Sequence, residues 1–143
     1  MDTDLIVLNL TKLGESSVVL HALSREYGRR SFVVKVSRKT SMSLFLPLNL
    51  LEADVSESPR STLWRAGAVT ARHPLNGIRS DMHKNTMTLF MSEVLYRAVK
   101  DGAYEAGLFE WLERSILTLD SLERGFLDYH LRFLLEVASA PGC

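Results

Sequence analysis

The sequence is short of the residues that build disulfides, metal centres and membrane spans. Its single cysteine is the last residue, Cys143, so neither an internal disulfide nor a Cys-x-x-Cys metal pair is possible within the chain. No apolar run approaches the roughly 20 residues that span a bilayer. Asp2 and Asp4 stand where a signal peptide would be basic. We therefore expect a cytoplasmic protein with no membrane segment and no metal.

The short motifs of the common enzyme classes are missing as well. There is no Gly-x-Ser-x-Gly elbow, no Walker-type loop and no Gly-x-Gly-x-x-Gly. The four histidines are scattered without an i,i+4 pair, and they are His21, His73, His83 and His130. Core or partly buried positions are the simpler interpretation for His21 and His130. Nothing in the sequence supports an enzyme, a cofactor or a small-molecule substrate.

The net charge of the chain is zero, but the charged residues are unevenly distributed. The chain has 17 Lys and Arg and 17 Asp and Glu, and 46% of its residues are hydrophobic, as in a globular protein. Residues 1–78 nevertheless hold ten cations and seven acids, whereas residues 79–143 hold seven cations and ten acids. Residues 25–39 alone contain six cations and only one acid, Glu26. The distribution of charge decides binding more than its total does, so this basic stretch is a candidate contact for phosphates.

The first half of the sequence has the pattern of β-strands. Alternating or continuous apolar runs predict strands over residues 4–10, 17–23, 31–36, 44–55 and 62–72, and residues 17–36 form a hairpin. Gly14 and Gly28 suit the tight turns. Pro47 marks an edge or a bulge of the long fourth strand, and Gly67 allows a bend in the fifth. Five short strands at even spacing predict a small barrel, for which the OB-fold is the commonest choice.

The second half changes to the period of an α-helix. Apolar stripes begin near Lys84, Leu108 and Phe126, and Ser80 or Asp81 is placed to cap the first helix. Glu110 and Glu113 are expected on the solvated side of the second. The fold class is thus α+β, an OB-fold barrel over residues 1–78 followed by a helical bundle over residues 79–143. The ending Ala-Pro-Gly-Cys follows a predicted helix so closely that we expect a truncated helical domain and a longer natural protein.

Two interpretations of the basic stretch remain open. In the first it binds DNA, and the phosphate contacts are Arg25, Arg29, Arg30, Lys35, Arg38 and Lys39, with Lys12, Arg65 and Arg72 as weaker candidates on neighbouring strands. Strand alternation places Phe32 in the core and Lys35 outside, which leaves Tyr27 as the better platform for a base. In the second interpretation the barrel is a protein-interaction module with no DNA role, or its cations simply protect a sheet edge from aggregation.

The order of several segments resembles one bacterial family. Gly14-Glu15-Ser16-Ser17, Gly28-Arg29 and the basic run from Lys35 to Lys39 resemble the N-terminus of the DNA repair protein RecO. Residues 46–52 (LPLNLLE), 90–96 (FMSEVLY) and 129–135 (YHLRFLL) resemble later segments of that family in the same order. Leu13 stands where many members have tyrosine, and Leu46 replaces a glutamine. The series covers nearly the whole chain, although no single motif is diagnostic.

This resemblance implies both a fold and a function. The fold is an OB-fold followed by a helical domain. The function is that of a non-enzymatic recombination mediator, nucleoid-associated in the bacterial cytoplasm, which binds single- and double-stranded DNA, anneals complementary strands and helps RecA to load. RecR and single-strand-binding protein are the implied partners. The tail of the latter is acidic and apolar, and Arg124 and Arg132 are the residues suggested to receive it.

Overall fold

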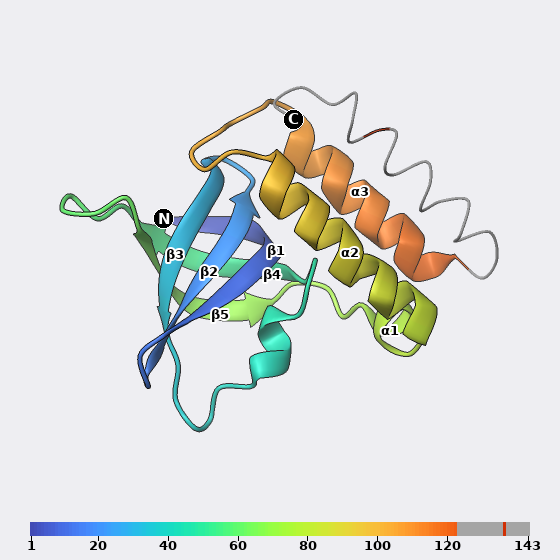
Figure 1. Cartoon of the computed structure of the whole chain (residues 1–143), viewed down its shortest axis with the longest axis horizontal. Coiled ribbons are helices and arrows are strands. Elements are labelled where there is room, and N and C mark those ends of the chain that lie inside the picture. Colours follow the sequence, from blue (N-terminus) through green and yellow to red (C-terminus); the bar gives the residue numbers. More distant parts are fainter. Residues whose placement is uncertain (123–135, 137–143) are drawn as a thin grey trace.

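The computed structural model describes residues 1–122 and 136, and it has the predicted order of strands first and helices after (Figure 1). The strands are β1 (Asp2–Leu13), β2 (Ser17–Ser24), β3 (Gly28–Lys35), β4 (Leu50–Ser56) and β5 (Trp64–Ala71). The helices are the 3-10 helix η1 (Met42–Phe45), α1 (Asn76–Arg79), α2 (Met82–Ala98) and α3 (Leu108–Ser121). The strands close into a barrel in the order β1-β2-β3-β5-β4, which confirms the OB-type barrel.

Strand alternation fills the barrel interior. In the β2–β3 hairpin Leu20 lies opposite Phe32, and Val18 lies opposite Val34. These four side chains belong to the buried cluster inside the barrel, and Phe32 is fully buried. Lys35 is exposed at the end of β3. Both expectations for this hairpin, an inward Phe32 and an outward Lys35, are confirmed.

The expected strand over residues 44–55 is wrong in its first half, because β4 begins only at Leu50. Residues 42–45 form η1, and Leu48 has a φ of 62°, in the left-handed region that a strand excludes. The side-chain amide of Asn49 donates to the carbonyl oxygens of Ser43 and Leu44, which holds this segment across one end of the barrel. The leucine-rich composition suggested a strand here. Pro47, however, has no backbone N–H to donate to a neighbouring strand, and the side-chain hydrogen bonds of Asn49 hold the segment in a different conformation.

Asp81 stands at the start of α2, the first long helix. Its carboxylate accepts hydrogen bonds from the backbone N–H groups of His83 and Lys84, so Asp81 is the N-cap of α2. The second predicted helix is confirmed as α3. The third stripe, near Phe126, lies outside the described residues. None of the helices in the described part is long and apolar enough to cross a membrane.

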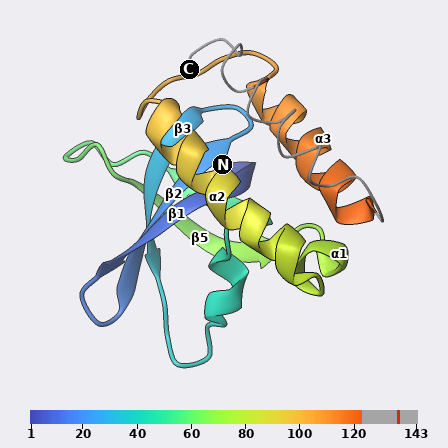
Figure 2. The ribbon, with the colours of Figure 1, turned by 45° about the vertical axis from the view of Figure 1, so that its right-hand side comes forward.

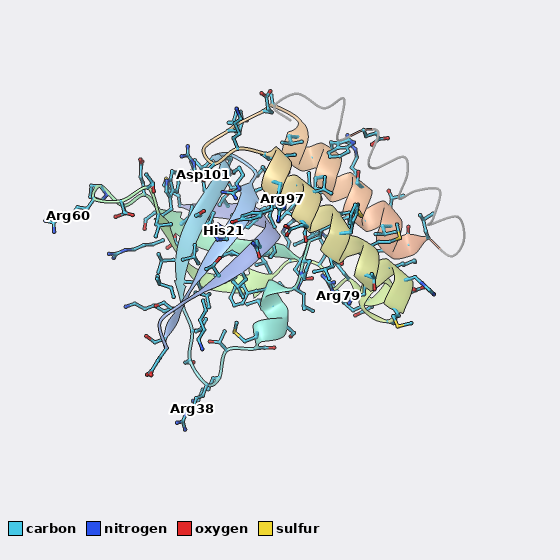
Figure 3. All side chains as sticks on the ribbon, viewed as in Figure 1. His21, Arg38, Arg60, Arg79, Arg97 and Asp101 are labelled. Carbon is cyan, nitrogen blue, oxygen red and sulfur yellow. The ribbon has the colours of Figure 1, made fainter. Side chains whose placement is uncertain are left out.

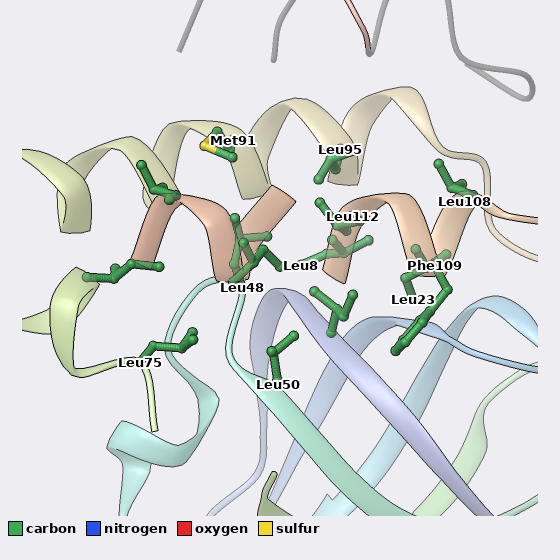
Figure 4. Packing of buried hydrophobic residues seen from close by; sticks show 14 of the residues in the cluster. Leu8, Leu23, Leu48, Leu50, Leu75, Met91, Leu95, Leu108, Phe109 and Leu112 are labelled. Carbon is green, nitrogen blue, oxygen red and sulfur yellow. The ribbon is translucent and has the colours of Figure 1, made fainter. Parts of the chain in front are cut away.

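The helices cover one side of the barrel through a shared apolar core (Figures 1 and 2). Alternate residues of β1 face opposite ways: Leu5 and Val7 belong to the barrel interior, whereas Ile6 and Leu8 pack with the helices. Figure 4 shows Leu8, Leu23, Leu48 and Leu50 of the barrel side against Met91, Leu95, Phe109 and Leu112 of the helices. β1 is therefore buried on both faces. The domain boundary expected at residue 78 stays a prediction.

Candidate nucleic-acid interface

The nine predicted cations lie in three different parts of the molecule. Arg25, Arg29 and Arg72 lie where the barrel meets the helices. Arg30 lies against the barrel aromatics. The remaining five form what we call the cationic rim: Lys12, Lys35, Arg38, Lys39 and Arg65.

Arg25 and Arg72 share one carboxylate at the barrel–helix junction. Arg25 donates to Asp4 of β1 (2.9 Å) and to Glu113 of α3 (3.0 Å), and its guanidinium lies 4.4 Å from the centre of the Phe109 ring. Burial lowers the pKa of Arg25, but the hydrogen bond to Asp4 and the neighbouring carboxylates together raise it above its ordinary value. Arg72 donates to the same Glu113 oxygen. Both cations are thus neutralised by acids inside the protein.

The expectation that Glu110 and Glu113 are solvated is therefore wrong for the second of them. The Glu113 side chain is 19% exposed, and Glu110 lies 3.6 Å from Arg25. Their polar side of α3 faces the barrel at this point, because Phe109 and Leu112 anchor the helix on it. Helical periodicity identified the two faces of α3 but not the arginines, Arg25 and Arg72, that directly follow β2 and β5.

Arg29 is the most buried of the predicted contacts. Its side chain is 7% exposed, it forms an ion pair with Asp101 (3.1 Å), and it lies over the ring of Tyr96 from α2. Its backbone N–H donates to the carbonyl of Ala103 (2.9 Å), so the loop after α2 is joined to the edge of β3. A DNA contact by Arg25, Arg29 or Arg72 stays a prediction, and in this structure each of them binds a carboxylate instead.

Arg30 and Tyr27 belong to an aromatic group around Trp64. The guanidinium of Arg30 lies 5.0 Å from the centre of the Trp64 ring and donates to the carbonyl of Tyr27. The Tyr27 ring is 5.2 Å from that of Trp64, at a tilt of 49°. Tyr27 is half-buried in this arrangement. Its role as a platform for a base stays a prediction.

The cationic rim lies at the end of the barrel turned away from the helices. Register places Leu13, Ser17 and Lys35 in one row across β1, β2 and β3, so Lys12 and Lys35 lie at the same end. Arg38 and Lys39 follow in the next loop (Figure 3), and Arg65 is the partner of Val33. All five side chains are exposed, and within residues 1–122 and 136 none of them has an ion pair. These five residues therefore carry positive charge that no acid of the described residues neutralises.

A groove of about 720 Å³ opens beside the rim, between β3, the segment after it and β5. Its walls include Val33, Lys35, Leu44, Phe45, Asp54 and Arg65. β3 and β5 pair only at Phe32–Trp64 and Val33–Arg65. Beyond that point β5 has a bulge opposite β4, with Ala68 at a φ of 50°, which bends the strand away from β3. Gly67 predicted this bend, but the groove that it opens was not predictable from the sequence.

Arg60 is a further exposed cation that the sequence reasoning did not select. It lies at the tip of the loop between β4 and β5, far from the helices (Figure 3). In OB-folds this loop and the one between the first two strands border the nucleic-acid face. Only the barrel topology, and not the local Ser-Pro-Arg-Ser sequence, identifies Arg60 as a candidate.

His21 is half-buried, as its position in a strand predicted. One ring nitrogen is 2.9 Å from the Thr11 hydroxyl and the other is 2.8 Å from the Ser31 hydroxyl, and the ring meets Tyr96 edge-on. Burial, and then the charge of Arg29, lowers the pKa of His21. The part of the chain that the structure describes contains no group of three or more side chains suited to a metal ion. His130, Arg124 and Arg132 lie outside the described residues.

A closed five-stranded barrel with a cationic end and a helical layer defines this chain as an OB-fold protein with a helical extension. Residues 1–70 match the family model described as Recombination protein O N terminal. The chain is 36% identical over 141 residues to the DNA repair protein RecO of Phocaeicola vulgatus and 34% identical to that of Bacteroides fragilis. Both alignments cover 96% of this chain and 58% of the relative. The RecO protein of Flavobacterium johnsoniae is 28% identical, over 98% of this chain and 61% of its own length.

Over nearly its whole length the chain is thus similar to DNA repair proteins named RecO. It spans about three fifths of the length of the curated relatives that it matches.

Proposed function

We propose that the barrel binds DNA through the cationic rim. The observation that carries this proposal is the set of five exposed cations, none with an ion pair among the described residues, beside a groove of about 720 Å³. Each cation that meets a phosphate releases condensed counterions, and this release favours binding irrespective of base sequence. The three arginines at the barrel–helix junction are weaker candidates for this role, since each of them already binds a carboxylate.

The relatives, which are named DNA repair proteins, support a more specific role for the whole protein. We propose a recombination mediator that binds and anneals single-stranded DNA and helps RecA to load, together with RecR and single-strand-binding protein. It would act by binding and not by catalysis, in the bacterial cytoplasm and at the nucleoid. Arg124 and Arg132 are retained as candidate contacts for the tail of single-strand-binding protein.

The alternative is an OB-type module that binds an acidic protein and has no DNA role. The formal net charge of zero favours it, because the chain as a whole does not attract polyanions. The two functions differ in one measurable property. The affinity of DNA binding through phosphates falls as a power of the salt concentration. The slope of log affinity against log salt concentration is proportional to the number of phosphate contacts.

A salt titration of the full chain with fluorescein-labelled single-stranded DNA tests the proposal. Lys35→Glu should weaken binding to all sequences and reduce the logarithmic salt slope by about 0.7 for the lost phosphate contact. Lys100→Glu is the matched control, because it makes the same charge change at an exposed lysine beyond the end of α2. If both variants lose the same affinity and slope, the rim is not the contact surface. If the parent protein binds no DNA at low salt, the DNA function itself is wrong.

A further inference from the structure

The barrel leaves none of its aromatic rings fully exposed to a ligand. Residues 1–72 contain four, which are Tyr27, Phe32, Phe45 and Trp64. Phe32, Phe45 and Trp64 are at most 7% exposed and belong to the barrel core. Tyr27 packs on Trp64, and its hydroxyl lies 3.3 Å from the sulfur of Met1. Each of these rings therefore already has a partner inside the protein.

The outer surface beside the rim is built from other side chains. Register places Thr11, Val19, Val33 and Arg65 in one row across four strands, and cross-strand partners in a sheet point to the same side. Val19 is only 7% exposed, so Thr11, Val33 and Arg65 form the accessible part of this row. Lys35 lies two residues beyond Val33 on that same side. The groove next to it has mainly aliphatic walls, with Lys35 and Arg65 among its lining residues. Phe45 also lines it but is only 4% exposed, and the one acid in its lining, Asp54, forms an ion pair with the N-terminus. This surface offers cations, hydroxyls and aliphatic groups to a ligand.

Such a surface suits one part of a nucleotide better than the other. A stacked base gains about 1–3 kcal/mol on an aromatic ring, and single-strand binders of the OB type use that gain. Phosphates need only cations and hydroxyl donors, and the aliphatic walls can contact the deoxyribose. From this arrangement, and resting on the proposed DNA function, we infer that the barrel holds the sugar-phosphate backbone and leaves the bases turned outward, with their pairing edges free.

This binding mode has a definite chemical consequence. A strand held by its phosphates can meet a complementary strand without leaving the protein, because pairing competes with no base contact. The affinity depends on the number of phosphates and is indifferent to the bases. A strand whose bases are stacked on the protein would lose affinity when those bases are removed.

The test compares two fluorescein-labelled oligomers of equal length and equal phosphate number, binding to the full chain at low salt. One is oligothymidylate, and the other is built from abasic residues. We expect their dissociation constants to agree within about twofold, since only phosphates and sugars are held. One stacked base would instead make the abasic oligomer bind about 5-fold to about 150-fold more weakly.

Different results would refute the backbone mode and the DNA function. A loss of fivefold or more on the abasic oligomer would overturn the backbone mode and leave DNA binding intact, with a base in the groove or on Tyr27. An absence of binding to both oligomers would overturn the proposed DNA function. Equal binding that weakens to the same extent for both oligomers in Lys35→Glu, and is unchanged in Lys100→Glu, would support the backbone mode at the rim.

Discussion

The carboxylate shared by Arg25 and Arg72 gives the sharpest test of how the helices are held on the barrel. Glu113→Gln keeps the shape of the side chain and removes its charge. Arg25 and Arg72 would then retain only Asp4, at 2.8 Å and 3.4 Å, and Arg25 would also keep the distant Glu110. Removing one member of a fully buried ion pair costs about 3–5 kcal/mol, whereas an exposed pair contributes less than about 1 kcal/mol. Glu113 is 19% exposed and part of the network survives, so we expect a loss of about 2 kcal/mol.

For a chain of this length that loss corresponds to a fall in Tm of about 6–8 °C, measured by circular dichroism. Glu93→Gln is the matched control. Its ion pair with Arg97 joins residues i and i+4 of α2, with side chains 49% and 78% exposed, and is expected to contribute about 0.3 kcal/mol. High salt should reduce the small effect of Glu93→Gln more completely than that of Glu113→Gln. If the two variants melt within about 2 °C of each other, the shared carboxylate does not hold the helices.

Two further predictions concern the edge of β3 and its neighbour on β2. Gly28→Ala should lower the free energy of unfolding by more than about 2 kcal/mol, because the φ of 74° disfavours alanine and the new methyl group would meet the carbonyl of Ala103. Gly14→Ala, at a φ of 71° with open space around it, should cost only about 1 kcal/mol, and equal losses in urea denaturation would contradict the steric argument. Because the folded protein lowers the pKa of His21 from its usual 6.5, the unfolded chain takes up the proton first. Stability should therefore fall as the pH drops below 6.5, and Tm should fall less in His21→Gln; parallel pH profiles would refute this.

The barrel could be predicted because strand alternation and turn residues depend on short stretches of sequence. Alternation alone places Phe32 inside and Lys35 outside, and the glycines identify the turns before β2 and β3. The start of β4 was not predictable in this way. A run of leucines around Pro47 has the composition of a strand, yet the left-handed Leu48 and the side-chain hydrogen bonds of Asn49 hold the segment in another form.

The sequence predicted which stretch of the chain is basic, but not which of its cations are paired with acids in the fold. The sequence selects Arg25, Arg29 and Lys35 equally, because all three belong to one basic stretch. Only the fold separates them, since Asp4, Glu113 and Asp101 come from distant parts of the chain to pair with the two arginines. Lys35 has no such partner among the described residues and remains the stronger candidate for phosphate.

The double burial of β1 has a practical consequence for anyone who wishes to isolate the barrel. A fragment that stops at residue 70, where the family match ends, would leave Ile6, Leu8, Leu23 and Leu50 facing water without the helices that cover them. Apolar patches of that kind lead to association and precipitation. The segment that the family model matches is thus shorter than the segment in which these side chains are covered. An isolated barrel would need polar substitutions on this outer face before its DNA binding could be measured.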